Sequence, residues 1–208
     1  MSSYPVPKQI LDRSVSATLL TLLLPVIVVV LAGMAIDMLL SRRDRGSILY
    51  REPRISRGRT FNLLKFRTLR QDVLTEMRDA GSHARLYEAD RANLTWTGRR
   101  ILKPWYLDEL PQFLNVLRGD ISLVGPRPWP PHMVERQVAE GHDYRNRIVA
   151  GLTGPAQVTK GTGRRFSDLD LEYLERCRSL GNWGVVRYDL EILFRTVRVI
   201  ARGEGLNY

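Results

Sequence analysis

An uncharged, strongly apolar segment near the N-terminus constrains the fold more than any other feature of the sequence. Residues 14–36 lie between Arg13 and Asp37 and contain no charged side chain. As a helix rising about 1.5 Å per residue, this segment is about 35 Å long, enough to cross a hydrocarbon core of about 30 Å. It is also longer than the apolar part of a signal peptide, which has about 7–15 residues. The sequence therefore predicts a membrane-inserted segment, with bounds at residues 1–41.

Pro25 lies in the middle of this apolar run. Because proline lacks an N–H and clashes with the preceding turn, we expect a kink or a break there. The residues leave two topologies open, a kinked helix that spans the bilayer and a helix–break–helix hairpin that re-enters the same leaflet. Basic residues flank both ends, with Lys8 and Arg13 before the segment and a heavier group after it. The positive-inside rule then keeps the rest of the chain on the cytoplasmic face.

Basic residues are concentrated directly after the apolar segment. Residues 42–70 contain ten arginines and lysines against two acids, so they carry a net charge of +8 out of +10 for the chain. Such a surplus implies an anionic partner, and its position beside an apolar segment favours an anionic membrane. The aromatic residues are not interleaved with the basic ones and no nucleic-acid-binding module is recognisable, so we expect no nucleic-acid partner.

Residues 42–208 are expected to form one cytoplasmic domain, mainly α-helical with a short β-hairpin. The hairpin is predicted around Arg57-Gly58. A helix is predicted near Pro111, which suits a first helical turn, with Leu110, Phe113, Leu114 and Leu117 on one apolar face.

A second amphipathic helix is predicted near the C-terminus. Such a helix can lie in a membrane interface or pack on a core, and it would also permit a homodimer. Its expected apolar face consists of Leu190, Leu193, Phe194, Val197 and Ala201. The chain has a single cysteine, Cys177, which excludes an internal disulfide. We expect Cys177 to take part in ordinary helix packing.

Two neighbouring acids, Asp108 and Glu109, precede the helix at Pro111. Acids in this position are typical of a helix cap. A carboxylate at the positive end of a helix is also well placed to attack a phosphorus atom, or to hold a metal that neutralises phosphate. Basic residues in turns rich in glycine and proline are candidate phosphate contacts, namely Lys103, Arg127 within residues 125–128, and Arg164 within residues 161–165.

Taken in order, these motifs resemble the bacterial sugar transferase family, whose small members are monotopic phosphoglycosyl transferases. The resemblance covers essentially the whole chain. It is carried by Lys65-Phe66-Arg67-Thr68, Leu107-Asp108-Glu109-Leu110-Pro111-Gln112, Asn115–Asp120, Gly125-Pro126-Arg127-Pro128, Gly151–Gly154, Ala156-Gln157-Val158, and Asp189 with Thr196. It implies the minimal catalytic form, without further membrane spans.

The resemblance implies a specific reaction. A phospho-sugar moves from a UDP-sugar to polyprenyl (undecaprenyl) phosphate and UMP is released, at the cytoplasmic face of the bacterial inner membrane. This is the first membrane step of a glycan or glycoconjugate pathway, such as one for exopolysaccharide or lipopolysaccharide. It also implies that Asp108 is the nucleophile, that Asp108 and Glu109 work with Mg²⁺, and that the N-terminal segment is a re-entrant hairpin broken at Pro25. The expected substrate-binding residues are Lys65, Arg67, Lys103, Gly125, Pro126, Arg127, Pro128, Gln157 and Arg164.

The sequence departs from the family pattern at several positions. Leu24 precedes the proline of the membrane break where the family usually has serine. Lys103 replaces an arginine five residues before the nucleophile, which keeps the charge and loses the bidentate fork. Tyr106 replaces a small hydroxyl residue. These changes leave the Asp108-Glu109 pair intact. A non-catalytic membrane anchor or scaffold is the competing hypothesis, in which the basic residues bind anionic lipid.

Overall fold

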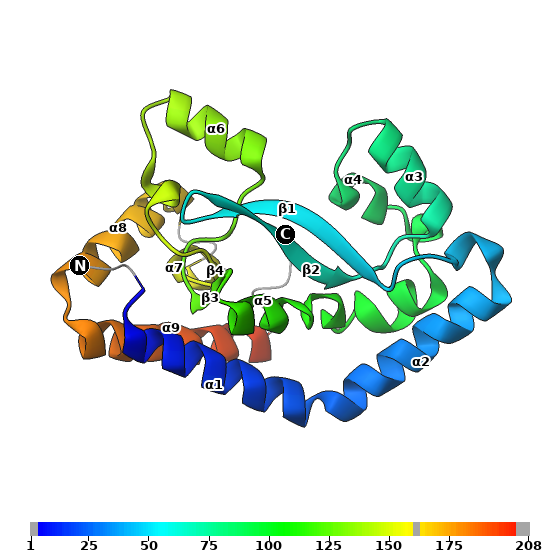
Figure 1. Ribbon diagram of the computed structural model, residues 1–208, viewed down its shortest axis with the longest axis horizontal. Helices are drawn as coiled ribbons and strands as arrows, with labels where there is room; N and C mark the ends of the chain where they lie inside the picture. The colour runs from blue at the N-terminus through cyan, green and yellow to red at the C-terminus, as the bar shows by residue number, and fades with distance from the viewer. Residues whose placement is uncertain (1–3, 160–162, 203–208) are drawn as a thin grey trace. The chain divides into compact units, whose positions relative to one another are not determined.

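The computed structural model describes residues 4–159 and 163–202, which are mainly helical with a short antiparallel hairpin, as expected (Figure 1). The α-helices are α1 (Val6–Leu22), α2 (Leu24–Leu40), α3 (Gln71–Asp79), α4 (Ala84–Glu88), α5 (Gln112–Arg118), α6 (Pro131–Ala139), α7 (Pro155–Val158), α8 (Phe166–Ser179) and α9 (Asn182–Ala201). The strands are β1 (Leu49–Ser56), β2 (Arg59–Phe66), β3 (Ser122–Val124) and β4 (Gly151–Thr153). Short helical turns are η1 (Arg42–Asp44), η2 (Arg91–Asn93), η3 (Gly98–Leu102), η4 (Leu107–Glu109) and η5 (Tyr144–Asn146).

The chain divides into two compact units that are interleaved in the sequence. The central unit consists of residues 18–51 and 64–113. The terminal unit consists of the described residues within 1–17, 52–63 and 114–208. The division at residue 41 between an inserted segment and a catalytic domain concerns membrane insertion and stays a prediction.

The apolar N-terminal segment is broken next to Pro25. Helix α1 ends at Leu22, α2 begins at Leu24, and the two helices are bent by 61°. Pro25 lies in the first turn of α2, where backbone N–H groups have no partner within the helix, so the N–H that proline lacks costs no hydrogen bond. Among the described residues, neither helix is long and apolar enough to cross a membrane alone, whereas the bent pair is, by length and composition. The expected break is confirmed, and the choice between spanning and re-entrant topology stays a prediction.

The central unit is built on the inner face of α2. Val30 and Met34 form an apolar cluster with Phe66 of β2, Leu102 and Leu110. The C-terminal part of α2 is also held by a polar contact, because the backbone N–H of Thr97 donates to Asp37 Oδ2 at 2.8 Å. A second apolar cluster covers α3 and consists of Leu69, Val73, Leu74, Met77 and Leu94.

The hairpin of β1 and β2 turns where the sequence predicts it. Arg57 and Gly58 have φ angles of 50° and 70°. Positive φ at both central residues is what a two-residue turn needs to follow the right-handed twist of its strands.

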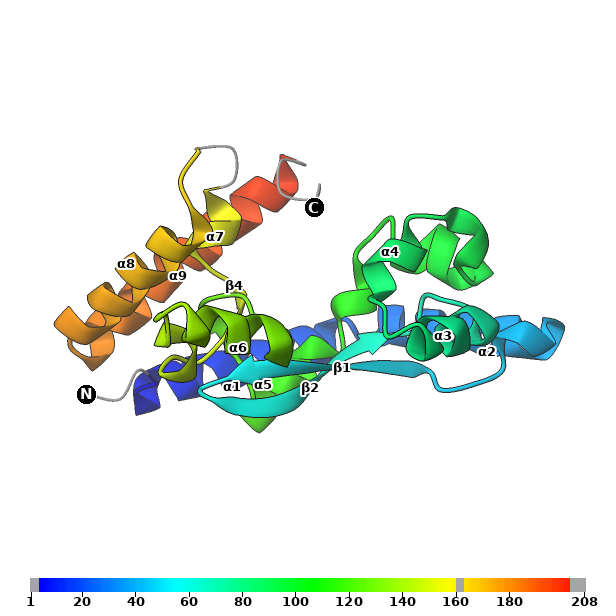
Figure 2. The same cartoon turned by 90° about the horizontal axis from the view of Figure 1, so that it is seen from above.

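The terminal unit contains a parallel pair, β3 and β4, in which Ser122 is opposite Gly151. The backbones approach so closely that a Cβ on Gly151 would lie 2.1 Å from the nitrogen of Gly125. Helices α8 and α9 pack together, with the rings of Tyr173 and Tyr188 stacked at 5.8 Å between centroids (Figure 2). Cys177 of α8 is buried and unpaired by disulfide, which confirms its expected role in packing.

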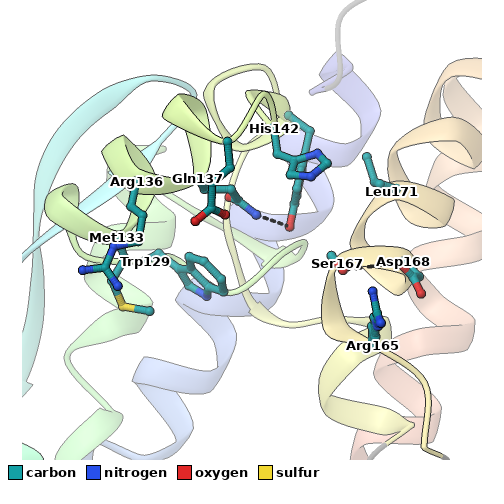
Figure 3. A pocket seen from close by; sticks show the side chains of 11 residues that line it. Trp129, Met133, Arg136, Gln137, His142, Arg165, Ser167, Asp168 and Leu171 are labelled. Atoms are coloured by element: carbon teal, nitrogen blue, oxygen red, sulfur yellow. Dashed lines mark hydrogen bonds between the residues drawn. The ribbon is translucent and has the colours of Figure 1, made fainter.

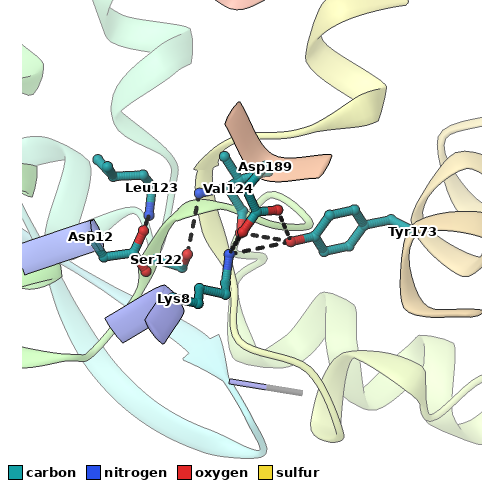
Figure 4. Close-up of polar contacts among 7 residues, drawn as sticks. All are labelled: Lys8, Asp12, Ser122, Leu123, Val124, Tyr173 and Asp189. Atoms are coloured by element: carbon teal, nitrogen blue, oxygen red, sulfur yellow. Dashed lines mark hydrogen bonds and ion pairs between the residues drawn. The ribbon is translucent and has the colours of Figure 1, made fainter. Parts of the chain in front are cut away.

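Helix α1 turns a polar stripe toward the terminal unit, which hydropathy alone does not predict. Lys8, Asp12 and Ser16 are all buried. Lys8 forms an ion pair with Asp189 of α9 and donates to the carbonyl of Val124 at 2.9 Å (Figure 4). Lys8 as a whole is only 1% exposed. The interpretation of Lys8 as a basic residue flanking the membrane segment is therefore wrong, because its side chain is enclosed in protein and paired with Asp189.

Two predicted helix faces differ from the observed ones. Helix α5 begins after Pro111, but its buried residues include Gln112, Asn115 and Val116, while Leu114 is exposed. Asn115 is buried because its amide donates to the carbonyl of Asn62 at 2.9 Å, a contact that apolar periodicity cannot reveal.

Helix α9 packs through residues other than its predicted apolar face. Val185, Val186, Asp189 and Ile192 are buried. Three members of the predicted face, Leu190, Phe194 and Val197, are exposed.

Candidate active site

The pair Asp108-Glu109 lies in the 3₁₀ turn η4, just ahead of α5. The preceding residue, Tyr106, has φ 54° and is one of two non-glycine residues with positive φ in the described chain. Left-handed backbone at a residue with a large side chain is strained and often accompanies functional sites. Asp108 is only 3% exposed, so its carboxylate is enclosed, whereas the side chain of Glu109 is 37% exposed. The two neighbouring acids therefore have different environments.

Lys103 is the direct partner of Asp108. Its Nζ donates to Asp108 Oδ2 at 3.0 Å and to Glu88 Oε2 at 2.8 Å. Glu88 also accepts a hydrogen bond from the hydroxyl of Thr68 at 2.7 Å. Lys103 was predicted from the sequence as a phosphate contact, whereas Glu88 and a role for Thr68 were not. Thr68 stands inside a motif of the family resemblance, whereas nothing in the sequence around Glu88 marks it.

Burial and charge act on Asp108 in opposite directions. Burial raises the pKa of Asp108, the ammonium of Lys103 lowers it, and the result is a pKa above the ordinary value. Burial lowers the pKa of Lys103, but Asp108 and Glu88 together raise it above its usual range. Lys103 is thus held in the charged form, and Asp108 is a poorly hydrated carboxyl beside a fixed cation. A carboxylate with little hydration and a defined partner is suited to act as a nucleophile.

Glu109 faces a second lysine. Lys65 Nζ of β2 lies 3.9 Å from Glu109 Oε1. The described residues contain no cluster of three or more side chains able to hold a metal ion. Magnesium usually takes one or two carboxylates and fills its remaining positions with substrate phosphate and water. Asp108 and Glu109 therefore fit Mg²⁺ as a partner of a bound diphosphate and not as a separate protein-built metal site.

Arg67, expected to contact substrate, has a structural environment. It is 2% exposed. Its guanidinium donates to the carbonyls of Ser47 at 2.8 Å, Leu69 at 2.9 Å and Asp44. With these donors engaged inside the central unit, Arg67 ties η1 to the end of β2, and its role is structural.

The segment Gly125–Pro128 also has a structural explanation. The N–H of Gly125 donates to the carbonyl of Thr153 at 2.8 Å, so it is engaged in strand pairing. Gly125, Pro126 and Pro128 are buried, and the side chain of Arg127 is partly exposed. A Cβ at Gly125 would lie 2.6 Å from a backbone oxygen, which explains the glycine without a ligand. Arg127 is the member of this group that a phosphate could reach.

Gln157 and Arg164 have contrasting environments in the terminal unit. Within the described residues, neither amide atom of Gln157 has a hydrogen-bond partner, although both atoms are buried. A buried amide without partners is costly, so Gln157 is a strong candidate for a ligand contact. Arg164 pairs with Glu172 at 2.8 Å on the surface. Gly161 and Thr162, part of the same predicted phosphate loop, lie outside the described residues.

The terminal unit also has an open hollow of about 440 Å³ between α6 and α8, which the sequence analysis did not anticipate (Figure 3). Trp129 and Gln137 point into it, and Gln137 donates to the hydroxyl of Tyr144 at 3.4 Å. Positive and negative side chains balance around its rim, so its charge favours no class of ligand. The rim charges are those of Arg136, Arg165, Glu140 and Asp168.

Comparison with known proteins shows which family the chain is similar to. Residues 3–203 match the family described as bacterial sugar transferase. The chain is 38% identical over 174 residues to a sugar transferase of Haemophilus influenzae, covering 79% of this chain and 36% of that protein. It is 33% identical over 205 residues to the undecaprenyl-phosphate glucose phosphotransferase of Komagataeibacter xylinus, covering 92% and 35% respectively.

A shorter relative is covered more fully. The chain is 35% identical over 201 residues to the UDP-glucose:undecaprenyl-phosphate glucose-1-phosphate transferase of Caulobacter vibrioides, covering 91% of this chain and 68% of that protein. The chain spans about a third of the length of the first two relatives. Because the family match extends over nearly all described residues, the chain belongs to the bacterial sugar transferase family.

Proposed function

We propose that this protein is a phosphoglycosyl transferase, which moves a phospho-sugar from a UDP-sugar to undecaprenyl phosphate and releases UMP. The observation that carries the proposal is the enclosed Asp108 carboxylate, held by Lys103 at 3.0 Å beside the more exposed Glu109. The names of two relatives, which specify undecaprenyl-phosphate glucose transfer, support the substrate class.

Two displacements at one phosphorus atom account for the reaction. In the first, an oxygen of Asp108 attacks the phosphorus that carries the sugar. The bond from that phosphorus to the bridging oxygen breaks, its electron pair stays on that oxygen, and UMP departs. In the second, a phosphate oxygen of undecaprenyl phosphate attacks the same phosphorus and the Asp108 carboxylate is released. Covalent catalysis divides one difficult transfer into two easier ones.

The basic groups near Asp108 have complementary roles in this scheme. Lys103 holds one oxygen of Asp108 in place, and Lys65 offers a cation to the diphosphate beside Glu109. Bound Mg²⁺, held by Asp108 and Glu109, would neutralise charge on the phosphate oxygens. For Arg127, Gln157 and Arg164, the family-motif residues of the terminal unit, a role in substrate binding is proposed from the family resemblance alone.

The contacts at both ends of the broken helix pair support a re-entrant topology. The start of α1 is tied to Asp189 and Val124 through Lys8, and the end of α2 is tied to Thr97 through Asp37. All three partners belong to the polar part of the chain after residue 41. A spanning segment would carry one of these ends across the bilayer and away from its partner, leaving a buried charge unpaired. We therefore propose that both ends lie at the cytoplasmic face of the inner membrane.

Helix α9 supports a membrane-facing position for the terminal unit. Trp183, Phe194 and Val197 are 75%, 63% and 65% exposed. Arg195 and Arg198 lie on the same helix and are also exposed. Apolar side chains next to arginines suit insertion between anionic headgroups and acyl chains. A homodimer remains compatible with this surface and is not needed for the proposed reaction.

The function is tested by UMP release from full-length protein in nanodiscs, with Mg²⁺, undecaprenyl phosphate and a panel of UDP-sugars. We expect release with at least one donor, abolished in Asp108→Asn. Glu135→Gln, an exposed change on α6 outside the family motifs, serves as a control for handling and reconstitution. If Asp108→Asn kept full activity, the nucleophile would be misassigned. If folded, membrane-bound wild type released UMP from no donor and formed no adduct, the scaffold hypothesis would replace the enzyme.

A further inference from the structure

A second carboxylate lies one side chain away from Asp108. Glu88, the last residue of α4, accepts from Lys103 Nζ at 2.8 Å through one oxygen. Its other oxygen accepts from the hydroxyl of Thr68, which is 4% exposed and follows β2. The contacts thus run from a buried hydroxyl through Glu88 and Lys103 to Asp108. All of these residues belong to the central unit.

The contact between Lys103 and Glu88 matters because residue 103 is a lysine and not an arginine. A lysine ammonium is a point charge on a flexible stem, whereas an arginine fork fixes its own orientation on a carboxylate. Lys103 is 31% exposed at its side chain, so packing alone does not confine it. A second anchor opposite Asp108 supplies the orientation that the lysine lacks. Glu88, with a side chain 22% exposed and held by Thr68, provides that anchor.

We propose that Glu88 is a positioning residue for the transfer reaction, holding the Lys103 ammonium on Oδ2 of Asp108 so that the other carboxylate oxygen is oriented for attack. This inference rests on the proposed function. Glu88 acts through Lys103 and does not contact the reacting phosphorus. A purely structural role for Glu88, fastening α4 through its contact with Thr68, is the competing explanation, and it does not depend on Lys103.

A double-mutant cycle separates the two explanations. Glu88→Gln, Lys103→Met and the double variant are compared with wild type as full-length proteins in nanodiscs, using a UDP-sugar that wild type accepts. We expect Glu88→Gln to lower kcat for UMP release about tenfold, with KM for the donor changed less than about twofold. In the Lys103→Met background the same change should cost less than about twofold, because the residue through which it acts is already gone.

Two further variants keep the test informative if Lys103→Met is too slow to measure. In a Lys103→Arg background the dependence on Glu88 should shrink, because a guanidinium fork orients itself. Thr68→Val removes the hydroxyl that holds Glu88 and keeps the side-chain shape, so it should lower kcat by a smaller factor than Glu88→Gln. Glu88→Asp, which keeps the negative charge, should restore part of the lost kcat.

Thermal unfolding of the same variants provides a readout that does not need activity. Non-additive changes in Tm for Glu88→Gln and Lys103→Met would confirm the pair, and additive ones would contradict the geometry. If the effects on kcat were additive, or if only KM changed, Glu88 would be structural and the proposal overturned. A wild type without UMP release from any donor, but with non-additive Tm changes, would instead refute the proposed function, and the positioning role would fall with it.

Discussion

Replacing Lys8 by methionine removes a charge from the interior of the terminal unit while keeping a side chain of similar length. The ammonium of Lys8 pairs with Asp189 and donates to the carbonyl of Val124 at 2.9 Å and to the hydroxyl of Tyr173 at 3.3 Å. In Lys8→Met, Asp189 would remain buried with the hydroxyl of Tyr173, at 2.8 Å, as its remaining side-chain donor. The variant therefore isolates the loss of one partner from a buried ion pair.

The expected cost is large. Removing one partner of a buried pair costs about 3–5 kcal/mol, because the other charge is left uncompensated. For a chain of this size each kcal/mol corresponds to about 2–4 °C in Tm, so Tm should fall by about 6–20 °C. The deficit should depend on pH. Burial raises the pKa of Asp189 and Lys8 opposes that rise, so without Lys8 the carboxyl takes up a proton more readily. A carboxyl whose pKa is higher in the folded state is stabilising at low pH and loses that contribution as pH rises, so the variant should be less impaired at pH 5 than at pH 8.

The assay is thermal unfolding in nanodiscs, followed by circular dichroism at both pH values. Arg13→Met removes an exposed cation from the same helix and should cost less than about 1 kcal/mol. The reasoning would be refuted if Lys8→Met melted within about 2 °C of wild type, a range smaller than the lowest shift expected from the cited scaling. An equal deficit at pH 5 and pH 8 would also contradict it.

Three further predictions concern other parts of the chain. Gly151→Ala should prevent folding, because its Cβ would lie 2.1 Å from a backbone nitrogen, whereas Gly181→Ala, with open space around it, should express normally. Burial raises the pKa of Cys177 from 9.0 to about 11, so a thiol reagent at pH 8 should react about 100-fold more slowly with folded than with denatured protein; equal rates would contradict this. Phe194→Asp should weaken sedimentation of the protein with anionic liposomes, and unchanged binding would remove α9 from the membrane interface.

Local features of the fold were predictable from the sequence. The turn at Arg57-Gly58 and the break at Pro25 depend on backbone preferences of a few adjacent residues, and both are confirmed. The pair Asp108-Glu109 was identified from its charge and its place before a helix. The structure adds that the two carboxyl groups differ in burial, which the sequence cannot distinguish.

Contacts between distant residues could not be predicted. Lys8 and Asp189 are separated by 181 positions. From the sequence alone, a lysine beside an apolar segment is expected to lie at the membrane surface. A buried arginine such as Arg67, whose donors go to carbonyls, is indistinguishable in sequence from one that binds phosphate. Glu88 lies in a polar stretch without periodicity, so its contact with Lys103 emerges only when α4 is folded against the turn before Asp108.

The central claim, that Asp108 carries the phospho-sugar between donor and acceptor, is tested most directly by mass spectrometry of the protein itself. Wild type in nanodiscs is given Mg²⁺ and an accepted UDP-sugar without undecaprenyl phosphate. The account predicts a mass increase of one phospho-sugar, on the peptide that contains Asp108, which disappears when undecaprenyl phosphate is added. Turnover without any adduct, or an adduct on another residue, would contradict the account.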